Sequence, residues 1–196
     1  MTRNNPNPRG ESLRIKVLDT ALQLFSRQGY FNTSIHDIRQ EAGVSIGAIY
    51  HHFKNKEALA CSLYESLLQL MEREIEAVAT GQHGCQQKCN AIIKKLFELT
   101  TDQPRNMQFI LLAQHREYLP NEAPICSSKP FQIMKGIIQE GIKTGEVREM
   151  EPWVAATAMF GGALRMMNLQ LDGVLSKPLI HYLDEVTESA WNAVKA

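Results

Sequence analysis

The chain has 196 residues, of which 44% are apolar and 21% charged, and this excludes a globally disordered protein. The formal net charge is zero, but residues 1–60 carry eight Lys and Arg against five Asp and Glu. A basic N-terminal part followed by an acidic remainder indicates a polyanionic partner at one end only. The longest mostly apolar stretch, 153–164, is too short to span a bilayer, and residues 1–10 lack the apolar segment of an export signal. Because four cysteines make no disulfide framework, we expect a reduced, cytoplasmic protein.

The first part of the chain predicts an arm and three helices. Residues 1–10, rich in Asn, Pro and Arg, are typical of a flexible arm. Apolar residues at three- and four-residue steps predict a helix over 11–28, which Gly29 ends. The same periodicity predicts two short helices, over 35–42 and 46–53.

The rest of the chain continues the helical pattern. Predicted helices cover 56–80, 86–102, 105–119, 131–144, 152–171 and 178–194. No run of alternating β-branched residues suggests a strand, so we expect an all-α protein of about nine helices. We divide it into an arm over 1–10, a head over 11–55 and a helical body over 56–196.

The two short helices are separated by Gly43-Val44-Ser45, which is typical of a helix-turn-helix. Helices this short are unstable alone and must pack on the preceding helix. If Ile49 and Phe53 face that helix, Tyr50 and His51 face outward. A helix-turn-helix offers this outward surface to base edges in the major groove.

The stretches "ALQLFSRQGYFNTSIHDIRQEAG" and "VSIGAIYHHFKNKEAL" resemble the DNA-binding head of the tetracycline-repressor (TetR) family, over about residues 14–59. The resemblance implies a transcriptional regulator, by default a repressor, released from a palindromic operator by a small apolar or amphipathic ligand. The alternatives are a helical enzyme, or a partner-binding protein whose head no longer binds DNA. The sequence contains no glycine-rich phosphate loop, His-Glu-x-x-His or Gly-x-Ser-x-Gly motif, so we expect neither enzymatic activity nor a cofactor.

The resemblance also implies which side chains contact DNA. The expected phosphate contacts are Thr33, Ser34, Tyr50, His52 and Lys56, and the expected base contacts are His36, Ile46, Gly47, Ala48 and His51. The alternatives are Tyr50 as a cap on the core and Lys56 as a solvated charge.

Among the expected base contacts, Ile46 and Ala48 carry side chains that cannot form hydrogen bonds. Ile46 and Ala48 lack the bidentate groups that discriminate bases most strongly. We therefore expect readout through thymine methyls, His36 and His51, aided by Arg3 and Arg9 of the arm in a minor groove.

Head units of this kind bind DNA as dimers, so the body must supply a dimer interface. Small residues leave one face of the 152–171 helix nearly bare, and a close partner helix would offset the cost of glycines there. The expected interface, a four-helix arrangement about a two-fold axis, comprises Ala155, Ala158, Gly162, Ala163, Leu183, Val186 and Trp191. Packing of the same residues within one chain is the alternative.

The resemblance implies a ligand pocket among the middle helices, and eight methionines suit an adaptable apolar site. The candidate residues are Phe97, Met107, Leu112, His115, Arg116, Phe131, Met134, Phe160 and Met167. An ordinary hydrophobic core would use most of the same residue types at the same spacing.

One further pattern, His83-x-Cys85-x3-Cys89, suggests a metal or thiol sensor. A fourth ligand is not identifiable, so no metal is predicted, and the sequence leaves open whether Cys85 and Cys89 sense a metal or an oxidant.

Overall fold

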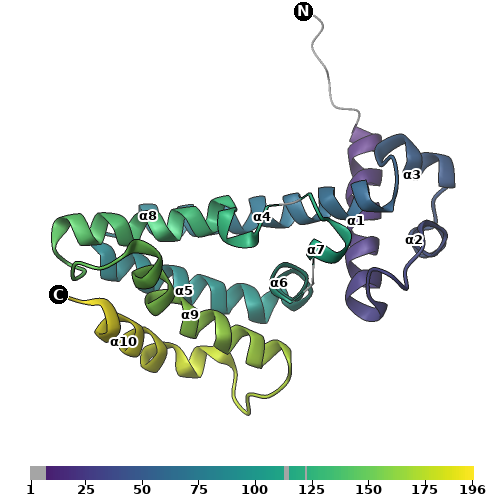
Figure 1. Cartoon of the computed structure of the whole chain (residues 1–196). Coiled ribbons are helices and arrows are strands. Elements are labelled where there is room, and N and C mark those ends of the chain that lie inside the picture. Colours follow the sequence, from purple (N-terminus) through teal and green to yellow (C-terminus); the bar gives the residue numbers. More distant parts are fainter. Residues whose placement is uncertain (1–7, 113–114, 122) are drawn as a thin grey trace, which may run out of the picture. The chain divides into compact units, whose positions relative to one another are not determined.

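The computed structural model describes residues 8–112, 115–121 and 123–196, apart from the side chains of residues 8, 9 and 116, and within these residues it is all-α, as predicted (Figure 1). The α-helices are α1 (Pro8–Gln28), α2 (Ile35–Ala42), α3 (Ile46–His52), α4 (Lys56–Thr80), α5 (Cys85–Asp102), α6 (Pro104–Leu111), α7 (His115–Tyr118), α8 (Lys129–Thr144), α9 (Pro152–Leu171) and α10 (Leu183–Val194). Two 3₁₀ turns, η1 (Ile125–Ser127) and η2 (Leu179–Tyr182), precede α8 and α10.

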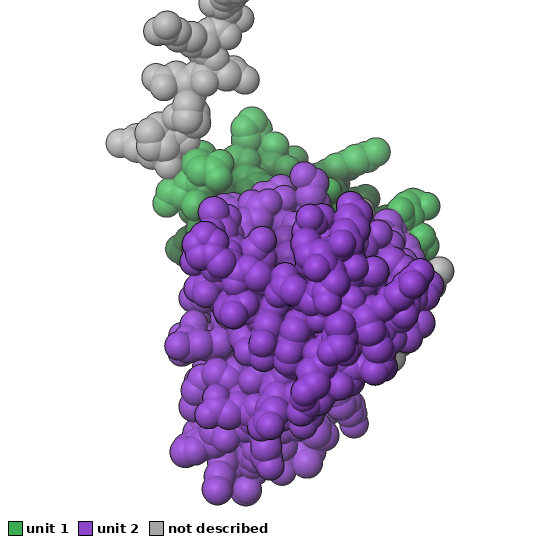
Figure 2. Space-filling view, turned by 90° about the vertical axis from the view of Figure 1, so that its left-hand side faces the viewer, with its two compact units in different colours: residues 1–66, 113–122 green, residues 67–112, 123–196 purple. Residues whose placement is uncertain are grey.

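The chain divides into two compact units (Figure 2). Unit 1 contains Met1–Ser66 and Ala113–Glu122, and unit 2 contains Leu67–Leu112 and Ala123–Ala196. This division differs from the boundary that we placed near residue 55, because the first part of α4 groups with the head. The segment that includes α7 does so as well.

Unit 1 is built on the mutual packing of α1, α2 and α3. Ile38 and Ile49 are fully buried and Phe53 is 2% exposed, and Val17 and Leu22 of α1 are buried as well. This confirms that Ile49 and Phe53 face inward. Since each buried side chain contributes about 1.5–3 kcal/mol, this core holds two helices that could not persist alone.

Local signals set the ends of the short helices. The Ser45 hydroxyl accepts a hydrogen bond from the Ala48 amide, which starts α3. Gly43 ends α2 with a φ of 62°, and its amide donates to the carbonyls of Arg39 and Gln40. That left-handed conformation is one that glycine adopts without steric cost. The Asn55 side chain accepts from the Ala58 amide, so the predicted start of the fourth helix is confirmed.

Unit 2 is arranged around α9, which contacts α5, α6, α8 and α10. Ala155, Met159, Ala163 and Met167 of α9 are all fully buried. The helix predicted over 105–119 is instead two elements, α6 and α7, and the end of the chain is η2 followed by α10. No helix in the described part of the chain is both long and apolar enough to cross a bilayer.

Candidate DNA-binding site

The outward surface of α3 carries the side chains that the sequence predicts. Tyr50 is 52% exposed, the largest outward side chain on α3. Gly47 and His51 are also exposed, and His36 of α2 is exposed as well. Ile46, Ala48 and His52 are half-buried. A short helix with one buried and one polar, exposed side can lie in a groove without losing its own core.

The start of α2 is fixed by a reciprocal capping box. The Asp37 amide donates to the Ser34 hydroxyl at 3.1 Å, and the Asp37 carboxylate accepts from both the amide and the hydroxyl of Ser34 at 2.7 Å. These hydrogen bonds lower the pKa of Asp37 below its ordinary value, the backbone bond contributing most. The Ser34 hydroxyl hydrogen is therefore used within the protein, although the side chain is exposed.

The structure corrects the expected role of Thr33. Its side chain is only 1% exposed, and its hydroxyl donates to the Gly29 carbonyl at 2.9 Å. A buried hydroxyl that already donates within the turn cannot also reach a phosphate. We therefore remove the Thr33 side chain from the proposed DNA contacts.

Lys56 also has an internal role that the sequence did not reveal. Its ammonium donates to the carbonyls of Tyr30 and Thr33, both at 2.9 Å, and lies 4.1 Å from the centre of the Tyr30 ring. Partial burial lowers the pKa of Lys56 from its ordinary value. An ammonium has three donors, so at most one remains for DNA.

Lys54, at the turn between α3 and α4, is a further candidate for a phosphate contact, which the sequence-based prediction did not include. It is exposed, unlike the half-buried Lys56 two residues later. A cation at this turn lies beside the first amides of α4, where the helix dipole also favours an anion. The two lysines, Lys54 and Lys56, do indicate a cation at this turn in the sequence. The sequence alone does not show which of the two points outward.

A cluster of aromatic rings joins α7 to the turn before α2. Tyr118 stacks on Tyr30 with ring centres 4.0 Å apart and an interplanar angle of 13°, and Phe31 meets Tyr118 edge-on at 6.2 Å. The His115 ring lies 4.2 Å from that of Tyr64 and 5.7 Å from that of Tyr118. Burial raises the pKa of Tyr118 well above its ordinary value. His115, expected in a ligand pocket, thus belongs to unit 1.

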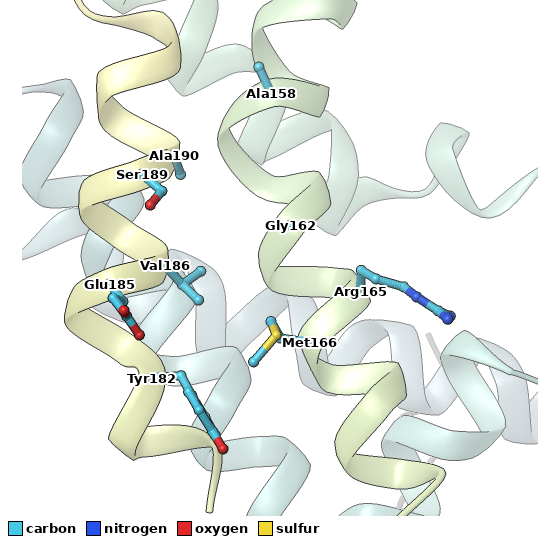
Figure 3. A pocket seen from close by; sticks show the side chains of 9 residues that line it. All are labelled: Ala158, Gly162, Arg165, Met166, Tyr182, Glu185, Val186, Ser189 and Ala190. Carbon is cyan, nitrogen blue, oxygen red and sulfur yellow. The ribbon is translucent and has the colours of Figure 1, made fainter. Parts of the chain in front are cut away.

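In unit 2, α9 and α10 leave an open groove of about 510 Å³ (Figure 3). Ala158, Gly162 and Val186, three of the residues predicted at the dimer interface, line it. Leu183 and Trp191 are half-buried. Ala155 and Ala163 are fully buried within the unit and face the chain's own core. Their predicted place at a dimer interface is therefore corrected.

Most candidates for the ligand pocket lie in the core of unit 2. Leu112 is half-buried, while six of them are no more than 9% exposed: Phe97, Met107, Phe131, Met134, Phe160 and Met167. The side chains of Arg116 and Arg9, like all of Arg3, lie outside the described residues.

Cys85 and Cys89 lie one turn apart on α5, with their sulfurs 4.0 Å apart and both side chains buried. The hydrogen bond between them lowers the pKa of Cys85 and raises that of Cys89, and burial raises the latter further. Among the described residues, no group of three or more His, Cys, Asp or Glu is placed to hold a metal ion. Buried thiols of this kind are ordinarily inert.

The fold and the outward side of α3 define a DNA-binding protein of the helix-turn-helix class. Residues 17–62 match the family described as bacterial regulatory proteins of the tetR family, and residues 63–196 match the tetracyclin repressor-like C-terminal domain. The chain belongs to the TetR family and is a DNA-binding transcriptional regulator, not an enzyme.

Two known proteins are similar in sequence over most of their length. The chain is 28% identical to the fatty acid metabolism regulator protein of Bacillus subtilis over 155 residues, which cover 75% of this chain and 77% of that one. It is 27% identical to the regulator LmrA of the same organism, over 86% of this chain and 91% of LmrA.

Two solved structures have the same fold. A TetR family regulator from Marinobacter aquaeolei superposes with a TM-score of 0.80 at 17% identity, over 95% of this chain and 97% of that one. FadR from Bacillus subtilis in complex with stearoyl-CoA superposes with a TM-score of 0.78 at 24% identity, over 91% and 98%.

Proposed function

We propose that this regulator is a homodimeric repressor, acting in the cytoplasm, that leaves a palindromic operator when a long-chain acyl thioester binds its body. The observation that carries the DNA-binding part is the division of α3 into a buried side, with Ile49 at 0% exposure, and an outward side bearing Tyr50 at 52%. Two such helices about a two-fold axis would read half-sites one helical turn apart, and such operators are palindromic.

The proposed phosphate contacts are Tyr50, His52, Lys54, the remaining donor of Lys56, and Ser34, whose exposed hydroxyl would have to exchange its hydrogen bond to Asp37 for one to a phosphate. Phosphate contacts of this kind set the register of a protein on DNA without reading its sequence. We assign base contacts to His36, Ile46, Gly47, Ala48 and His51. Gly47 has no heavy atom within 4 Å of where a side chain would begin, so its backbone can approach a base edge closely.

The proposed effector class is supported by similarity to known proteins and by the composition of unit 2. A relative 28% identical over three quarters of the chain is a fatty acid metabolism regulator, and a structure with the same fold holds stearoyl-CoA. The core of unit 2 contains the methionines Met107, Met134, Met159 and Met167, all at most 3% exposed. Flexible thioether side chains can rearrange around an acyl chain with little loss of packing.

Two pieces of chain can carry the effect of the ligand to the head. α4 runs from Lys56 in unit 1 to Thr80 in unit 2 without a break. The segment 115–121, which follows α6, places Tyr118 on Tyr30 beside the start of α2. A coupling of about 1–3 kcal/mol through either route would change operator affinity several-fold to a hundredfold.

The test begins with enrichment of bound genomic fragments to find the operator, followed by fluorescence anisotropy at several salt concentrations. We expect affinity to fall steeply with salt, and Tyr50→Ala to weaken binding to all sequences alike while the fold is retained. Unchanged DNA binding by Tyr50→Ala would contradict the assigned DNA interface.

The effector is tested on the same complex. Stearoyl-CoA should release the operator, whereas free coenzyme A, which has the same headgroup without the acyl chain, should not. Release by both compounds, or by neither, would contradict the proposed acyl thioester.

A further inference from the structure

The two helices that line the α9–α10 groove carry opposite charges. Arg165 is the one charged residue in the twenty of α9. α10 contains Asp184, Glu185 and Glu188 and no basic residue. A face with a basic helix beside an acidic one is complementary to a copy of itself turned by 180°.

Arg165 and Glu185 both line the groove, but from opposite flanks (Figure 3). Arg165 extends from the side of α9 that points away from α10, while Glu185 projects from the α10 side of the groove. Both residues are exposed, and within the described part of the chain neither forms an ion pair. Between these two charged residues the groove is lined by the apolar residues Gly162, Met166 and Val186.

The floor of the groove can accept a closely packed helix. A side chain at Gly162 would meet no heavy atom within 4 Å, so nothing in this chain fills the space above it. If the two-fold axis of a four-helix arrangement runs along α9 and α10, the outer flank of α9 meets α10 of the other copy. Arg165 then faces an acidic helix, and Glu185 faces a basic one.

We propose that, in the homodimer proposed above, Arg165 at one flank of this groove pairs with the partner's Glu185, twice across the two-fold axis. The proposal rests on the homodimer proposed above and adds the side chains that decide which chain is accepted. Each ion pair would lie at the edge of an apolar groove, where a like-charged partner is rejected more strongly than in open water. Related regulators with the same fold but other charges would thus be excluded.

Charge reversal tests the pair. Arg165→Glu places two acids opposite each other at both contacts, and Glu185→Arg places two bases there. By sedimentation at micromolar concentration, each variant alone should dissociate with a constant raised about ten- to a hundredfold. When the two variants are mixed, every contact regains opposite charges, so a one-to-one heterodimer should form with nearly wild-type affinity.

A matched control is available on the same helix turn. Asp184→Arg makes the same change of charge in the first turn of α10, but Asp184 is not among the residues that line the groove. It bears the same penalty from the helix dipole, and it should leave dimerisation unchanged. Circular dichroism confirms that each variant is folded.

The outcomes separate this inference from the homodimer itself. A wild-type chain that is monomeric at micromolar concentration would overturn both. A wild-type dimer whose affinity is unaffected by either reversal would overturn only the Arg165–Glu185 pairing, and so would single variants that dissociate but do not recover when mixed.

Discussion

Lys54 and Lys56, two residues apart, have different environments at the start of α4. Lys54 is exposed, whereas the ammonium of Lys56 holds the carbonyls of Tyr30 and Thr33. The sequence predicted a cation at this turn, but it could not predict that a turn 26 residues earlier would use it. Similarly, hydroxyl side chains at Thr33 and Ser34 were predicted, but the burial of Thr33 depends on tertiary packing that no local pattern records.

The two lysines provide a matched pair of variants. Lys56→Met leaves two carbonyls without their charged donor, and we expect it to lower the free energy of unfolding by about 1–3 kcal/mol. Lys54→Met should leave stability unchanged but weaken DNA binding and reduce the salt slope by about one. Chemical denaturation and a salt titration of operator affinity check both. If Lys54→Met bound DNA like the wild type, the assignment of Lys54 would be wrong.

The capping box makes the start of α2 sensitive to acid. Because hydrogen bonds from Ser34 lower the pKa of Asp37 in the folded state, its stabilising contribution is fully present above the ordinary value of 3.8. It is lost as the pH falls through the lower folded pKa, since protonation removes the acceptor. The unfolding free energy of Asp37→Asn should thus lie below that of the wild type at pH 7, and the gap should close in acid. A gap that is independent of pH would contradict this.

At the scale of elements, periodicity predicted the helices well because each has an amphipathic face that must be buried. The failures lie where packing interrupts a continuous pattern. Residues 105–119 have helical spacing throughout, yet they divide into α6 and α7, and α7 groups with unit 1. That segment packs Tyr118 on Tyr30, a pairing between residues 88 apart in sequence that no local signal can reveal.

Substitutions at Tyr118 test this packing. Its hydroxyl is buried with no hydrogen-bond partner among the described residues. Tyr118→Phe should therefore be neutral or stabilising, while Tyr118→Ala removes a buried ring and should cost about 3–5 kcal/mol. Calorimetry of the two variants measures both changes in the free energy of unfolding. Marked destabilisation by Tyr118→Phe would show that the hydroxyl does have a partner.

For the whole molecule, the sequence located the helix-turn-helix closely, because a short motif with strict spacing specifies it. It located the groove that we propose as the dimer face only in part. Alanines at 155, 158 and 163 and the glycine at 162 share one helix, but α9 is surrounded by neighbours, so the small residues on one side serve the core and those on the other remain open. A stripe of small residues does not say which of two neighbours it accommodates.

Substitutions at two helical glycines test whether a partner chain covers the open face of α9. At both Gly136 of α8 and Gly162 of α9, an added methyl group meets nothing within 4 Å in this chain. Each change to alanine should stabilise its helix by up to about 1 kcal/mol in the absence of a partner. We expect Gly136→Ala to leave self-association unchanged and Gly162→Ala to weaken it, measured by sedimentation. Equal behaviour of the two variants would place the dimer contact elsewhere.

The passage of α4 from one unit into the other has a practical consequence. Ser66 and Leu67, where the units meet along the chain, lie in the interior of a 25-residue helix. Proteases cleave extended backbone that they can draw into their active sites, and an intact helix does not present it. Limited digestion should therefore not release a separate head at this position. A fragment truncated there would also leave its terminal helix without the turns that carry Met71 and Ile75, both at most 1% exposed.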